Sequence, residues 1–294
     1  MKISTAQFFK TNSEAMSKGQ FEVSSLQAKL GSGKQLTSPS DDSSKANLIS
    51  RFQSSLERQG VYRQNIEVAK TRLVSEESAL TSITAVFQRA SEIAILAANG
   101  TMVAEDRAVL GAEIGELRKE LIRLGNTRDI NGEYIFAGNR INSPPYEENG
   151  SGEVAYVGDS GRLSVNVSDT RSIAINTLGS ELLRPEEFSA VLSLEQGLKT
   201  NDVSSIQASI GQLKDSSDRI SVSFGSMAGR FSALNSQEEV LEDTSLRIKQ
   251  ILSESKDLDY AKAITDLSKE SLALQALQAS FTKISQLTLF NFMR

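Results

Sequence analysis

The longest regular pattern in the chain runs through residues 206–248, which read IQASIGQLKDSSDRISVSFGSMAGRFSALNSQEEVLEDTSLRI. An apolar residue recurs there at every seventh position without a gap: Ile206, Leu213, Ile220, Met227, Leu234, Leu241 and Ile248. A seven-residue apolar period keeps these side chains on one face of an α-helix, as helices in coiled coils and bundles require. The stretch therefore predicts one long helix that packs lengthwise against others.

Similar apolar periods lie on both sides of this stretch. They predict helices over residues 5–30, 44–98 and 104–124, and a last helix from about Asp259. Glycine or asparagine follows each of the first three, and both residues commonly end helices because they adopt left-handed backbone conformations. Asp42 or Ser43 is expected to cap the start of the second helix.

The period changes between about residues 131 and 185. Residues 162–168 alternate polar and apolar side chains, and residues 154–157 precede them across a glycine-containing loop, which predicts a β-hairpin. Residues 133–137 and 172–175 are further candidate strands. We therefore expect a mainly α fold, a long antiparallel coiled coil and helical bundle formed by the N- and C-terminal segments, with a small β-rich insert domain.

These patterns divide the chain into three layers. We expect residues 1–40 and 256–294 to form a terminal assembly coiled coil, residues 41–130 and 186–255 to form the core of a helical bundle, and residues 131–185 to form a small β-rich outer domain.

The last block is rich in apolar residues and nearly free of charge. From Ser271 onward, Lys283 and Arg294 are its only charged residues. A narrow two-helix seam would leave part of this surface uncovered, so we expect other subunits to bury it. The expected assembly interface comprises Phe9, Met16, Val23, Leu30, Leu274, Leu277, Phe281, Ile284, Leu287, Phe290 and Phe292.

Composition argues against several classes of function. A net charge of −5, without a dense cluster of Lys and Arg, argues against nucleic-acid binding. The chain has no His and no Cys, which removes the commonest zinc ligands and thiol nucleophiles. No serine-nucleophile motif or convincing carboxylate pair replaces them. We therefore expect no enzyme activity, no catalytic residue, no cofactor and no metal.

Membrane association is not expected either. No stretch approaches the roughly 18 apolar residues of a membrane-spanning helix. The amphipathic ends lack the basic polar face that helices lying on membranes usually carry. The first ten residues lack the continuous apolar segment of a secretory signal peptide.

Two short motifs have structural interpretations. Gly31-Ser32-Gly33-Lys34 resembles the end of a phosphate-binding loop, but Ala28 and Gln35 stand where that motif needs Gly and Ser or Thr. We interpret it as a helix end. The paired aspartates near positions 41 and 257 lack the alternating oxygen ligands of a calcium loop, and helix capping explains them better.

Four segments carry a resemblance to a known family. Residues 30–42 resemble the N-terminal signature of bacterial flagellins and their hook-associated relatives. Residues 1–5, 126–138 and 287–292 resemble the hook–filament junction branch more than filament flagellin. The family usually places Pro after the aspartate pair, where this chain has Ser43.

The resemblance implies a structural subunit of the bacterial flagellum, an adaptor ring between hook and filament. It implies self-association, contacts with a neighbouring hook-associated protein and with filament-side subunits, and secretion through the flagellar type III export channel with a chaperone at the C-terminal region. It also implies that the terminal blocks are disordered in the monomer and order on assembly. The absence of Cys and the unburied heptad ends agree with this independently.

Two alternatives stay open. One is a short flagellin that builds the filament itself. The other is a secreted coiled-coil effector.

Overall fold

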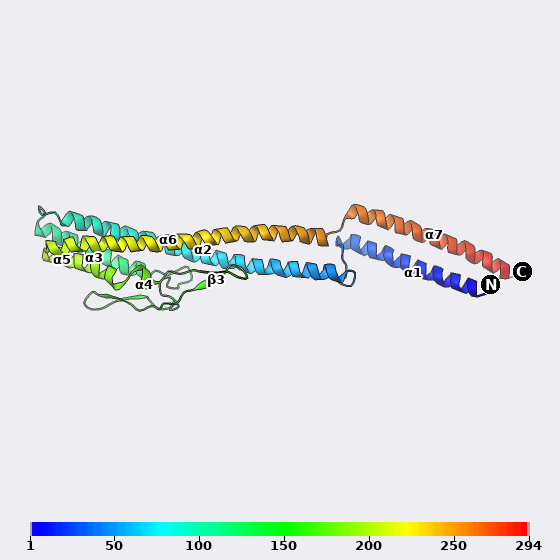
Figure 1. The fold of residues 1–294 in the computed structure, drawn as a ribbon, viewed down its shortest axis with the longest axis horizontal. Helices are drawn as coiled ribbons and strands as arrows, with labels where there is room; N and C mark the ends of the chain where they lie inside the picture. The colour runs from blue at the N-terminus through cyan, green and yellow to red at the C-terminus, as the bar shows by residue number, and fades with distance from the viewer. Residues whose placement is uncertain (1, 293–294) are drawn as a thin grey trace. The chain divides into compact units, whose positions relative to one another are not determined.

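The computed structural model describes the backbone of residues 2–292 and the side chains of residues 7–286. Its helices are α1 (Lys2–Ser32), α2 (Ser43–Ala97), α3 (Ala104–Gly125), α4 (Gly179–Leu182), α5 (Pro185–Thr200), α6 (Val203–Lys256) and α7 (Tyr260–Phe292). Its strands are β1 (Tyr146–Glu148), β2 (Val154–Tyr156), β3 (Ser164–Asn166) and β4 (Ser172–Ala174). The prediction of a mainly α fold with a small β-rich insert is confirmed (Figure 1).

The chain forms two compact units. The two ends of the sequence, Met1–Arg58 and Asp243–Arg294, form the terminal unit. The middle of the sequence, Gln59–Glu242, forms the central unit. Because α2 and α6 run past these limits, each of them contributes residues to both units.

The central unit has a continuous apolar core in which the predicted heptads meet. Six members of the heptad run lie in this unit, and all of them are buried: Ile206, Leu213, Ile220, Met227, Leu234 and Leu241. Their partners in the core include the α2 heptad positions Ile66, Leu73, Leu80, Phe87 and Ala94, which are fully buried. In Figure 1, α6 runs alongside α2, and α3 packs against α5. Each large aliphatic side chain buried in this way contributes roughly 1.5–3 kcal/mol to stability.

The strand pairing differs from the predicted hairpin. β2 pairs with the preceding strand, β1, and β3 pairs with the following strand, β4. The insert therefore holds two separate antiparallel hairpins. The predicted pairing of residues 154–157 with 162–168 is therefore wrong. The physical reason lies in the loop between them, where the Asp159 carboxylate accepts hydrogen bonds from the backbone N–H groups of Asn139 and Gly161, at 2.7 and 2.8 Å. This loop is fastened to another loop and does not close a hairpin.

The candidate strand at residues 133–137 is also wrong, because this segment is a buried loop. Its apolar side chains are buried, but its backbone N–H groups bond to other loops. Tyr134 donates to the carbonyl of Ile141 at 2.8 Å and Ile135 to that of Thr127 at 3.2 Å. The side chain of Arg72, on α2, reaches this segment and pairs with Glu133 at 3.0 Å. The segment thus anchors the insert to the helices of the central unit.

Within residues 2–292, no helix combines the length and the apolar character needed to cross a bilayer.

Candidate assembly interface

The terminal unit is built around an antiparallel pair of helices, α1 and α7 (Figure 1). The half-buried side of α1 follows alternating spacings of three and four residues, through Phe9, Asn12, Met16, Gly19, Val23, Leu26 and Leu30. The matching side of α7 follows the same alternation through Ala263, Leu267, Glu270, Leu274, Leu277, Phe281 and Ile284. This alternation is the pattern of a two-helix coiled coil. We call these two rows the terminal seam.

Two contacts bring the helices of the terminal seam together. The rings of Phe9 and Phe281 pack edge to face, with centroids 5.4 Å apart and planes at 87°. Further along, a Cβ atom on Gly19 would lie 3.3 Å from Cδ1 of Leu274, so the missing side chain lets α7 approach closely. An aromatic pair at one point and a glycine at another fix the register of the two helices.

The structure places the sequence-predicted interface residues as follows. Phe9, Met16, Val23 and Leu30 lie on the α1 side of the terminal seam, and Leu274, Leu277, Phe281 and Ile284 lie on the α7 side. All eight are half-buried. Leu287, Phe290 and Phe292 fall within α7, but their side chains lie outside the described residues.

The terminal seam does not form a closed core. Among the described side chains of α1 and α7, Ala263 alone is buried, at 5% exposed. Large apolar side chains on the outer faces remain open to solvent: Phe21 is 70% exposed, Leu272 69% and Ile264 54%. Exposed apolar surface of this kind is typical of protein interaction sites. The helix pair is therefore suited to further packing.

A short bridge between the helix ends closes the terminal unit beside α1 and α7. Gly33 has φ +66°, which glycine adopts without strain, and it ends α1 as the sequence predicted. Just after it, Lys34 forms an antiparallel bridge with Asp257. Its two hydrogen bonds run from the N–H of Gln35 to the carbonyl of Lys256 at 2.8 Å, and from the N–H of Leu258 to the carbonyl of Gly33 at 3.0 Å.

Sequence reasoning identified the turn but missed its partner. A one-residue β-bridge has no periodicity, so no sequence signal marks which distant segment it meets.

Aspartates fix the starts of the adjoining helices. Asp42 accepts the backbone N–H of Lys45 at 2.9 Å and so caps α2, which decides between the two predicted caps. Asp259 caps α7 in the same way, through the N–H of Lys262 at 3.1 Å. The Asp41 carboxylate accepts the N–H of Ser38 and also bonds Thr37, and these hydrogen bonds hold the pKa of Asp41 below its ordinary value. The paired aspartates thus cap and brace helix ends.

The chemistry available at the interface is apolar packing. Across the part of the chain that the structure describes, no group of three carboxylates converges as metal ligands do. The terminal seam itself presents mainly aliphatic and aromatic side chains. What this arrangement can do is bind another apolar helix surface.

Comparison with known proteins agrees with this geometry. The family model of the bacterial flagellin N-terminal helical region matches residues 3–140. Flagellar hook-associated protein 3 of Salmonella typhimurium is 26% identical, with 100% of each chain covered. Flagellar hook-associated protein 3 of Escherichia coli is 27% identical, with 99% of each chain covered.

A solved structure shares the fold. A protein from Vibrio parahaemolyticus, described as a flagellar hook-associated protein, superposes with a TM-score of 0.69 at 20% identity, covering 74% of this chain and 100% of that chain. The predicted resemblance is therefore confirmed in both sequence and fold. Over its full length the chain is similar to flagellar hook-associated protein 3, and its residues 3–140 match the bacterial flagellin N-terminal helical region.

Proposed function

We propose that this chain is a structural subunit of the bacterial flagellum that joins the hook to the filament as an adaptor ring. One observation carries the proposal: the helix pair of α1 and α7 leaves its seam half-buried and large apolar side chains exposed on its outer faces. The full-length relatives are named flagellar hook-associated proteins, which supports assigning the exposed surface to contacts within the flagellum. The chain acts by packing, and it is not an enzyme.

The mechanism of joining follows from the energetics of burial. When neighbouring helices cover Phe21 or Leu272, the buried side chain contributes roughly 1.5–3 kcal/mol to the free energy of assembly, less the cost of ordering that side chain. Several such residues along one helix pair are enough to hold a subunit in an array. The central unit, with its own core, keeps its fold during this step.

The partners of the interface are other flagellar components. We assign the outer faces of α1 and α7 to copies of the same chain within the ring, to a neighbouring hook-associated protein and to filament-side subunits. Because such contacts are apolar and lengthwise, they suit helix pairs of the same pattern in related subunits.

Export is the second part of the proposal. We infer that the chain is secreted unfolded through the flagellar type III channel, aided by a chaperone at the C-terminal region, and that residues 1–40 and 256–294 are disordered in the monomer and order on assembly. The absence of Cys supports this, because the chain cannot misoxidise between compartments. The near absence of buried side chains in α1 and α7 supports it too, since little apolar burial offsets the ordering entropy.

Deletion of the encoding gene tests the joining role. The proposal predicts cells that build hooks but release or lack filaments, and that recover filaments when the gene is returned. Normal filament attachment in the deletion strain would exclude it.

A short filament flagellin is the second candidate, favoured by the match of residues 3–140 to the flagellin region. Purified subunits distinguish the two. An adaptor does not grow alone into long filaments, whereas a flagellin does.

A further inference from the structure

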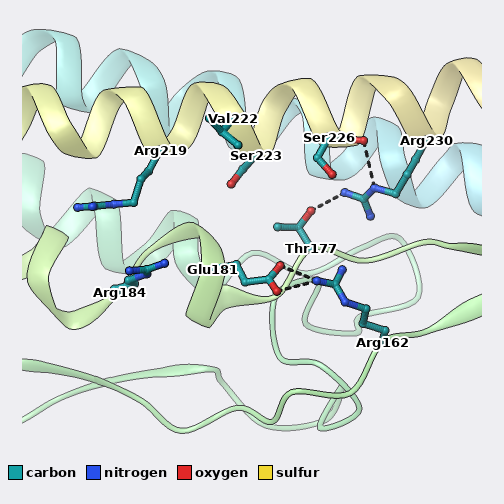
Figure 2. Close-up of a pocket in the computed structure, with 9 residues that line it drawn as sticks. All are labelled: Arg162, Thr177, Glu181, Arg184, Arg219, Val222, Ser223, Ser226 and Arg230. Carbon is teal, nitrogen blue, oxygen red and sulfur yellow. Dashed lines mark hydrogen bonds and ion pairs between the residues drawn. The ribbon is translucent and has the colours of Figure 1, made fainter.

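A cavity of about 330 Å³ in the central unit is lined by arginines. It lies between α6 and the segment that leads into α5, and four of its lining residues are Arg162, Arg184, Arg219 and Arg230 (Figure 2). We call it the arginine pocket. Nothing in the packing of α1 and α7 involves it, since its residues all belong to the central unit.

The positive charges of the arginine pocket are not fully balanced. Three of the four guanidinium groups have one carboxylate partner each: Arg162 with Glu181 at 2.6 Å, Arg219 with Glu187 at 2.6 Å, and Arg230 with Glu76 at 2.8 Å. Arg184 forms no ion pair with any residue that the structure describes. Four cations therefore face three carboxylates, which leaves one positive charge without a counter-charge.

Several donors around the pocket also lack acceptors. Arg219 bonds Glu187 through Nε, which leaves both of its terminal nitrogens available. Nη1 of Arg230 is shielded from solvent and has no hydrogen-bond partner. A buried donor without an acceptor costs folding free energy, so such groups in proteins usually meet a ligand or an ordered water.

We propose that the arginine pocket binds one small oxyanion, a phosphate, sulfate or carboxylate group, held chiefly by Arg184 and Arg219. Guanidinium groups present paired N–H donors that match two oxygens of such an anion. Figure 2 shows Arg219 extending from α6 and Arg184 lying across from it at the start of α5. An anion between them supplies the missing negative charge and separates two like charges that otherwise repel.

Inorganic phosphate is the probe for the test, titrated into the full chain by calorimetry at constant ionic strength against sodium chloride. Arg184→Gln removes the unpaired charge. Because Arg184 is exposed and makes no side-chain capping bond to α5, this change leaves the fold intact. We expect it to weaken phosphate binding about tenfold, and Arg184→Lys to restore part of the loss. Arg63→Gln, at an exposed arginine of α2 outside the pocket, is the matched control and should bind as the unchanged chain does.

The outcomes separate the sources of the anion. Phosphate binding that acetate does not displace supports a site for a free phosphate or sulfate ion. Equal displacement by acetate supports the same site filled by a protein carboxylate. Absence of phosphate binding above the chloride baseline, or equal binding by Arg184→Gln and Arg63→Gln, would overturn the proposal.

Discussion

Phe9 and Phe281, from opposite ends of the chain, pack edge to face with their ring centroids 5.4 Å apart. The contact joins α1 to α7 within the terminal seam, whose side chains are half-buried apart from the buried Ala263. An aromatic pair in this geometry contributes about 0.5–1.5 kcal/mol beyond its burial. The pair thus aligns the two helices.

Replacement of Phe281 by Ala tests the contribution of the terminal seam to assembly. We expect Phe281→Ala to raise the protein concentration needed for assembly by roughly 5–30-fold, which corresponds to about 1–2 kcal/mol. Unfolding of the central unit should not change. Co-sedimentation with flagellar partner subunits measures the first effect, and urea unfolding measures the second. The double variant Phe9→Ala, Phe281→Ala should lose less free energy of assembly than the sum of the losses in the two single variants, because the two rings contact each other.

The outer face of α1 is tested at Phe21, which is 70% exposed. If neighbouring subunits cover it, Phe21→Ala weakens assembly to a similar degree without disturbing the contact between α1 and α7. Glu22→Ala, at the next position, which is also exposed, is the control and should have little effect. The same co-sedimentation assay applies. Equal co-sedimentation of the two variants would show that Phe21 is not part of the interface.

The turn after α1 is tested at Gly33, whose φ is +66° and whose Cβ would lie 2.7 Å from the Tyr260 hydroxyl oxygen. Gly33→Ala should destabilise the bridge to Asp257 by about 1 kcal/mol, because alanine is strained in this conformation. Faster amide exchange at Gln35 and Leu258 in assembled subunits measures the loss. Gly31→Ala, with open space at its Cβ, is the matched control.

A second change separates the two causes of strain at Gly33. Tyr260→Phe removes the hydroxyl contact but not the backbone strain. On the Gly33→Ala background it should therefore restore only part of the amide protection. Full restoration would show that the side-chain contact dominates.

The contact between α3 and the insert is tested at Gly125, where an added Cβ would lie 2.7 Å from the ring of Tyr146. This ring cannot move away easily, since it is buried and its hydroxyl donates to the Gly179 carbonyl at 2.8 Å. We expect Gly125→Ala to destabilise the central unit by about 1–3 kcal/mol. Thermal unfolding measures the change. Gly60→Ala, with open space within α2, should instead stabilise by roughly 0.5–1 kcal/mol.

The pH dependence of stability is tested at Glu195, which accepts hydrogen bonds from Lys199 at 2.6 Å and Arg118 at 2.9 Å. Burial raises the pKa of Glu195, but these hydrogen bonds outweigh it, and the pKa lies below the ordinary value of 4.5. The stabilisation is therefore present above about pH 4.5 and is lost as the pH falls through the folded-state pKa. Urea unfolding at pH 7 and at successively lower pH measures it.

Matched variants assign this pH dependence. Glu195→Gln should be markedly less stable than the unchanged chain at pH 7, and the difference should shrink below pH 4.5. Glu116→Gln is the control. It removes an exposed carboxylate of α3 that pairs with Lys119 on the same helix, and it should change stability little. A constant difference between the Glu195→Gln and unchanged chains at every pH would contradict the account.

The helices could be predicted from sequence because burial repeats along them. Ile206 and the members of its heptad are buried at the expected positions, and the end of α1 at Gly33 has the left-handed backbone that glycine commonly provides. Strand pairing could not be predicted in the same way. Residues 154–156 alternate equally well for either neighbour, and a side-chain bond from Asp159 to the loop at Asn139 decides the outcome.

The candidate sites differ in the same respect. The seam positions from Phe9 to Ile284 could be named because they follow heptads. The arginine pocket could not, because its residues come from separate segments with no spacing rule, and their proximity arises from tertiary folding.

The central claim, that α1 and α7 are an assembly element covered by neighbouring subunits, is tested most directly by cysteine labelling. The chain contains no Cys, so Leu272→Cys gives a single reactive thiol on the outer face of α7, where Leu272 is 69% exposed. Ser151→Cys, on an exposed turn of the insert, serves as the reference. We predict that maleimide labels both thiols rapidly in the dilute monomer, and that in isolated hook–filament junctions it labels position 151 but not position 272. Protection of position 272 already in the monomer, or equal labelling of it in the junction, would contradict the claim.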